Sequence, residues 1–208
     1  MKKLFLILAF FTMPALTHGA SNRYVVTTTT SSISMDLLAS VTASSNSSVD
    51  FTGLAGNKYT QFILYADRVY PVLANVYPQL QVATGGAFIA SGYRWQSVTI
   101  SSFTSSISGN ASDTVFILSG TETIGTVAAN QLSSYEIHLH GVDGETALKR
   151  VNFWSTGLWS SGFYKSIYGG GEVDTGSLYI TGVRFSMSSS VYVASGTFRL
   201  YGIRNSQN

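Results

Sequence analysis

Short runs in which apolar and polar side chains alternate recur along most of this 208-residue chain. In one of them Val183, Phe185 and Met187 alternate with Arg184 and Ser186. A period of two places apolar side chains on one face of an extended strand and polar side chains on the other. Each run is therefore expected to form a strand of an antiparallel sheet with one buried face.

Clusters of Gly, Ser and Asn separate the alternating runs, as turns between strands require. The runs lie at 59–65, 79–83, 95–101, 114–119, 134–140, 149–154, 178–187 and 191–203. Only 67–73 and 127–132 have a pattern that suits a turn or two of helix. Many short strands separated by turn residues predict an all-β fold, an antiparallel β-sandwich or jelly roll.

The sequence divides into three parts. Residues 1–20 begin with Lys2 and Lys3 and continue with an apolar run, a pattern typical of a secretory signal peptide and too short for a spanning helix. The alternative is a hydrophobic N-terminal arm, in which case residues 4–16 would contact a membrane. Residues 21–48 are rich in Ser and Thr, which favours a linker or a peripheral strand. The β-sandwich domain is expected over 49–208.

The composition argues against several classes of protein. Charged residues make up 11% of the chain, against roughly 25% in an ordinary soluble domain. The net charge of +2 comes from Lys2 and Lys3, so the remainder has no basic stripe for nucleic acid. Cysteine is absent, which excludes disulfides, cysteine-bound zinc and thiol catalysis.

Motifs for catalysis are missing from the sequence. No Gly-x-Ser-x-Gly segment is present, and the acidic residues are scattered singly rather than arranged as a pair. No Gly-rich loop follows a strand and opens a helix, so a phosphate-binding loop is excluded as well. We expect no enzymatic activity and no cofactor.

One polar cluster matches part of a metal-binding pattern. Glu136, His138 and His140 would point to the same face of a strand, and Glu145 follows them. His-x-His with a later Glu resembles the first half of the cupin metal motif, but the expected glycines and a third histidine are missing. These four residues are the candidate metal ligands. The alternative is a polar strand face that leads into a turn at Asp143-Gly144.

Aromatic residues are concentrated between 153 and 168, interleaved with Ser and Gly, before three consecutive glycines. Flat rings of this kind either fill the core of a sandwich or bind sugars and partner chains on its surface. The candidate ligand-binding residues are Trp154, Trp159, Tyr164 and Tyr168. Trp154 and Trp159 are the two expected to differ in burial.

Several segments together resemble a known group of proteins. They are Val-Asp-Phe-Thr-Gly-Leu at 49–54, Ser-Gly-Tyr-Arg-Trp at 91–95, Lys-Arg-Val at 149–151, Phe-Tyr-Lys at 163–165, and the segments 180–185 and 194–203. They resemble tailed-phage virion proteins in which a β-sandwich ends in a Ser-Gly-Thr-x-x-Leu-Tyr-Gly strand. The resemblance implies a particle-surface or tail protein that forms homo-oligomers or contacts other virion proteins, and that touches host glycans. It supplies no functional residues.

Three functions remain open at this point. The first is a non-catalytic structural or binding protein of a phage-like virion or a cell surface. The second is a secreted lectin-like carbohydrate-binding module, and the third is a cupin-like metal-binding protein. The expected location is the virion or, if residues 1–20 direct export, the cell surface or the extracellular space.

Overall fold

The computed structural model describes residues 34–101, 104–124, 132–159 and 162–204. In these ranges two antiparallel sheets of eight and five strands pack as a sandwich, which confirms the predicted fold class. The only helical segments there are the 3₁₀ turns η1 (Gly56–Lys58) and η2 (Ser188–Ser190). Within the same ranges, no helix has the length and apolar character needed to cross a membrane. Segment 1–20, with its proposed membrane contact at 4–16, lies outside them.

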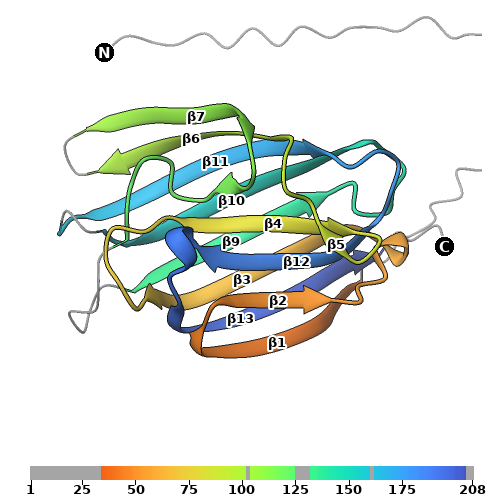
Figure 1. Cartoon of the computed structure of the whole chain (residues 1–208), viewed down its shortest axis with the longest axis horizontal. Helices are drawn as coiled ribbons and strands as arrows, with labels where there is room; N and C mark the ends of the chain where they lie inside the picture. Colours follow the sequence, from red (N-terminus) through yellow and green to blue (C-terminus); the bar gives the residue numbers. More distant parts are fainter. Residues whose placement is uncertain (1–33, 102–103, 125–131, 160–161, 205–208) are drawn as a thin grey trace, which may run out of the picture. The chain divides into compact units, whose positions relative to one another are not determined.

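The larger sheet contains eight strands in the order β1-β13-β3-β9-β10-β11-β6-β7 (Figure 1). In chain order these are β1 (Met35–Asn46), β3 (Tyr59–Pro71), β6 (Tyr93–Ser101), β7 (Ser105–Asp113), β9 (Ser133–His140), β10 (Leu148–Leu158), β11 (Tyr164–Asp174) and β13 (Val193–Arg204). The strand that ends the chain, β13, therefore pairs between two strands from its beginning. Strands β9, β10 and β11 lie side by side at the centre.

The smaller sheet has the order β2-β12-β4-β5, with β8 paired to β4. Its strands are β2 (Ser48–Thr52), β4 (Pro78–Thr84), β5 (Ala87–Phe88), β8 (Phe116–Ile117) and β12 (Ile180–Met187). Figure 1 shows this sheet lying across one face of the larger sheet. The opposite face of the larger sheet is left without a covering layer in the described part of the chain.

The core lies between the two sheets and is built by the alternation read from the sequence. Phe185 of the smaller sheet is fully buried, and its ring centroid lies 5.4 Å from that of Tyr135 and 5.1 Å from that of Phe198. These last two rings come from β9 and β13, so one side chain ties three strands together. Burying rings of this size is the main favourable contribution to folding.

One prediction of a helical turn is wrong. Residues 67–71 continue β3, and a β-bulge breaks the register with β9 between Ala66 and Val69. Arg68 in this bulge has a positive φ of 55°. The extra residue locally shifts the alternation, which is why the segment has no clear period of two. The other predicted helical turn, 127–132, falls almost entirely outside the described residues.

Two stretches without an alternating pattern also form strands. β1 lies in the Ser- and Thr-rich segment 21–48, where it is an edge strand paired with β13 from Met35 to Asn46. β11 contains the three consecutive glycines 169–171 and pairs with β10 and β6 along its length. The aromatic segment 153–168 therefore belongs mostly to two central strands.

Candidate functional site

The outer face is the face of the larger sheet that points away from the smaller one. Its side chains fall into rows that cross the strands, because partners in neighbouring strands stand directly opposite each other. The register gives three such rows, which we name the aromatic, amide and charged rows after their members.

The aromatic row crosses seven strands. Its members, from β13 to β7, are Arg199, Tyr65, Glu136, Trp154, Tyr168, Val98 and Ile107. Trp154 and Tyr168 are its centre: their rings are nearly parallel, at 12°, with centroids 6.2 Å apart. Trp154 is 44% exposed and Tyr168 is 48% exposed. Two large flat rings are thus stacked across neighbouring strands, with about half of each residue exposed to solvent.

The amide row runs parallel to the aromatic row, two residues along each strand. Its members are Tyr201, Ile63, His138, Asn152, Gly170, Gln96 and Gly109. At Gly170 an added Cβ would lie 3.1 Å from the Asn152 side-chain oxygen and 3.1 Å from the Val151 carbonyl oxygen. The absence of a side chain here keeps the floor of the face low between the amides of Asn152 and Gln96.

His138 in the amide row is held by both ring nitrogens. Its Nε2 lies 2.7 Å from Glu136 Oε1, and its Nδ1 lies 2.6 Å from Gln61 Nε2. In the matching tautomer Nε2–H donates to the carboxylate and Nδ1 accepts from the amide. The hydrogen bonds of this imidazole are therefore saturated by its neighbours, and it fixes the position of Glu136 beside Trp154.

The charged row lies two residues further along. It contains Ile203, Gln61, His140, Arg150, Glu172 and Arg94. Arg94 and Glu172 form an ion pair at 3.1 Å. Burial lowers the pKa of His140, and the charges of His138 and Arg150 lower it further. His140 is accordingly neutral at pH 7, and the arginines carry the positive charge of this row.

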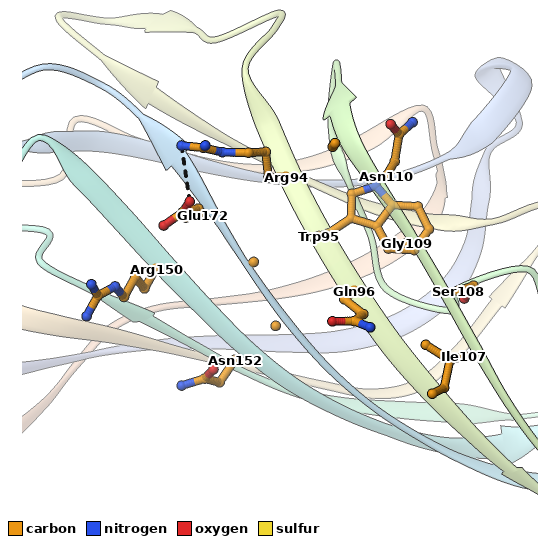
Figure 2. Close-up of a pocket in the computed structure, with 13 residues that line it drawn as sticks. Arg94, Trp95, Gln96, Ile107, Ser108, Gly109, Asn110, Arg150, Asn152 and Glu172 are labelled. Carbon is orange, nitrogen blue, oxygen red and sulfur yellow. Dashed lines mark ion pairs between the residues drawn. The ribbon is translucent and has the colours of Figure 1, made fainter.

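Three hollows lie along these rows and share lining residues. Tyr65, Glu136 and Trp154 line one of about 330 Å³, and Trp154, Tyr168 and Asn152 line one of about 240 Å³. The third, of about 620 Å³, is shown in Figure 2: Arg150 and Asn152 lie on one side of β11 and Gln96 lies on the other. Adjacent hollows share lining residues and so follow one another across the outer face, and we name the surface that the three span the groove.

The candidate metal ligands do not fit a metal site. Glu136, His138 and His140 do share a face of β9, as their spacing predicts, but both nitrogens of His138 are engaged. Glu145 lies in the turn after β9, where its backbone N–H donates to the Asp143 side chain. Among the described residues no group of three or more His, Cys, Asp or Glu side chains could hold a metal ion.

The four candidate aromatic residues do not stay together. Trp154 and Tyr168 are neighbours in the aromatic row, while Tyr164 lies on the same face, four residues or about 13 Å along β11 from Tyr168. Trp159 does not join them: it is completely buried, and its indole N–H donates to the Lys165 carbonyl at 3.4 Å. The expected difference between Trp154 and Trp159 is confirmed, and Trp159 belongs to the core.

Sequence reasoning missed most of the polar residues of the groove. Arg150 and Asn152 have the same parity as Trp154, so the alternation along β10 was a signal that they share its face. Tyr65 and Gln96 come from strands far apart in the sequence, and only the strand order reveals them. A scan against protein-family models and a search of curated proteins found no match. The function is therefore inferred from the residues of this face.

Proposed function

We propose that this chain is a non-catalytic glycan-binding protein and that the groove on the outer face is its binding site. The observation that carries the proposal is the parallel, half-exposed pair of Trp154 and Tyr168. The apolar face of a pyranose ring stacks on aromatic rings, and stacking on an exposed ring contributes roughly 1–3 kcal/mol in comparable cases.

The polar groups beside the rings suit sugar hydroxyls. Gln96 presents an amide that both donates and accepts hydrogen bonds. The Asn152 amide nitrogen lies 3.4 Å from His140 Nε2, which leaves its oxygen as an acceptor, and Glu136 presents an acceptor held in place by His138. Binding sites for small ligands combine an apolar platform with a few fixed polar groups in this way. Location at a cell surface or on a virion, the expectation from the sequence, would bring the groove to host glycans.

Catalysis is not part of the proposal. Glu136 and Glu172 stand two strands and four residues apart, about 16 Å, which exceeds the carboxylate separation of roughly 5–9.5 Å that glycosidases use. Asp67 lines the same hollow as Glu136, but its carboxylate accepts a hydrogen bond from Ser134 at 2.8 Å. If the protein did hydrolyse a glycan, Asp67 and Glu136 would be the residues to substitute.

A glycan array probed with the purified chain and with Trp154→Ala tests the proposal. We expect the wild type to bind a defined set of oligosaccharides without shortening them, and the variant to bind them at least tenfold more weakly. Tyr192→Ala is the matched control, because Tyr192 is 51% exposed but precedes β13 and lies outside the three rows. Binding that survives Trp154→Ala, or that is lost equally in Tyr192→Ala, would contradict the proposed site.

A second candidate function is assembly into a phage-like particle. The strands at the two edges of the larger sheet carry exposed apolar side chains: Ile107 of β7 is 70% exposed, and Met35 and Leu37 of β1 are 54% and 56% exposed. Edge strands with apolar side chains are the usual places where copies add to each other. Light scattering of the purified chain, with Ile107→Lys as the variant, tests whether copies associate through β7. A monomer at high concentration would argue against this candidate.

A further inference from the structure

We propose that the glycan of the outer face carries an anionic group, a carboxylate or a sulfate ester, and that Arg150 binds it. This inference rests on the proposed function and names the class of ligand. Arg150 lies in the charged row, on the same strand as Trp154 and on the same face. Both residues border the groove.

Arg150 differs from the other arginine of its row. Arg94 is paired with Glu172 at 3.1 Å, so the carboxylate opposite Arg150 is already engaged. Within the described ranges, Arg150 makes no hydrogen bond or ion pair with another side chain. Its guanidinium therefore keeps all of its N–H donors available to a ligand at the border of the 620 Å³ hollow.

The charge around this part of the groove favours an anion. The described residues that line the 620 Å³ hollow include two arginines, one glutamate and no other charged side chain, which leaves one positive charge. His140 adds none at pH 7, because burial and the nearby charges of His138 and Arg150 lower its pKa. A guanidinium offers two parallel N–H groups to a carboxylate or a sulfate oxygen pair, which makes it a specific reader of such groups.

The spacing between Arg150 and Trp154 sets the size of the ligand. Four residues of strand separate them, about 13 Å, and Asn152 stands between the two. A single sugar ring cannot stack on Trp154 and reach Arg150 at once, so the ligand needs at least two rings. Beside Asn152, Gly170 of β11 leaves the floor free of a side chain, and Gln96 stands on the other side of β11, where hydroxyl groups of the ligand would lie (Figure 2).

The test uses an array on which sialylated, uronic-acid and sulfated oligosaccharides are each printed beside a neutral counterpart. We expect the wild-type chain to prefer the anionic member of a pair by about tenfold, the worth of one charge-assisted contact. Arg150→Gln is expected to abolish this preference, so that the anionic and the neutral member of a pair bind equally. Raising the salt concentration should weaken only the anionic interaction.

Arg184→Gln is the charge-matched control, because it removes one arginine from the smaller sheet. Equal binding of both members, lost in Trp154→Ala, would overturn this inference and leave the proposed function standing. An anionic preference that persists in Arg150→Gln would overturn the role of Arg150. Binding to no member of the array would overturn the inference and the proposed function together. The sialylated, uronic-acid and sulfated pairs show separately whether a carboxylate or a sulfate is read.

Discussion

The outer faces of the two sheets obey the same alternation but carry different residues. On the smaller sheet a hollow of about 430 Å³ is lined mainly by Ser and Gln side chains. Its arginine, Arg184, is satisfied within the fold: it donates to both oxygens of Asp50, at 2.9 and 2.6 Å, and lies 4.0 Å from the centre of the Phe88 ring. The larger sheet instead exposes Trp154, Tyr168 and an arginine without such a partner.

The difference shows which side chains are enough to cover the outer face of a sheet. Short polar side chains and a paired arginine are enough to cover the smaller sheet, and they add little stability. A half-exposed tryptophan gains only part of the free energy of burial, and the proposed glycan site gives its exposed half a role. Substitutions on one outer face can therefore serve as controls for substitutions on the other.

The largest expected effect is a difference in unfolding free energy between variants of Trp154, in β10, and of Trp159, just after it. Trp159→Ala should lower the free energy of unfolding by about 3–5 kcal/mol, because it leaves a cavity in the core. Trp154→Ala should lower it by less than about 1 kcal/mol, since half of that ring already faces solvent. Urea unfolding followed by circular dichroism measures both, and similar losses would contradict the division into core and site.

The next effect concerns the floor of the groove. Gly170→Val should weaken glycan binding about tenfold, because its side chain would rise between the amide-bearing strands, where an added Cβ would lie 3.1 Å from the Asn152 side-chain oxygen. Valine is a good strand former, so the unfolding free energy should change by less than about 1 kcal/mol. Calorimetric titration with an array-selected glycan measures the binding. Unchanged affinity would mean that the ligand does not cross Gly170.

A smaller effect is expected on the other sheet. Although partial burial acts to raise the pKa of Asp50, the hydrogen bonds from Arg184 and Ser48 outweigh it and lower that pKa below 3.8. The stability from this pair is therefore present above about pH 4 and is lost as the pH falls through the lowered pKa. Asp50→Asn should cost about 0.5–1 kcal/mol at pH 7, less in high salt, and leave glycan binding unchanged. A loss of glycan binding in Asp50→Asn would contradict the assignment of the binding site to the larger sheet alone.

The smallest effect is a titration shift at His140. Its pKa should lie below 6.5, so stability falls as the pH drops from 6.5 through the lowered value, where the unfolded chain binds the proton first. Arg150→Gln removes one of the charges that lower this pKa and should move it upward. NMR titration of the imidazole signals measures the pKa of His140 in the wild-type chain and in Arg150→Gln. An unchanged pKa in Arg150→Gln would place the guanidinium away from His140 and from the charged row.

Sequence alone predicts the sheets better than the site. The alternation along 134–140 and 149–154 predicts β9 and β10. It also predicts that Glu136 and Trp154 point outward, because the face on which a side chain lies follows from its position along its own strand and does not depend on the neighbouring strands. It misses β11, since glycine has no side chain to alternate and disfavours strands by itself. Here β11 forms because β10 and β6 pair with it on both sides.

The pairing of Trp154 with Tyr168 depends on information that local sequence lacks. The two residues are opposite only because β10 and β11 pair in one register, and no tight two-residue turn between them announces it. Tyr65 and Arg199 join the same row because β13 inserts between β1 and β3, a consequence of the whole topology. Trp159, by contrast, lies just past the end of β10, where parity no longer applies.

The rows across the larger sheet have a consequence for how this protein can change over time. The groove takes its residues from strand positions rather than from the connecting loops. Loops at either end can therefore grow, shrink or vary without disturbing the groove. A single substitution at an outward position, such as 96, 150 or 152, changes one contact and leaves the hydrogen-bonded ladder intact. New binding preferences are thus reachable one residue at a time on a scaffold that stays the same.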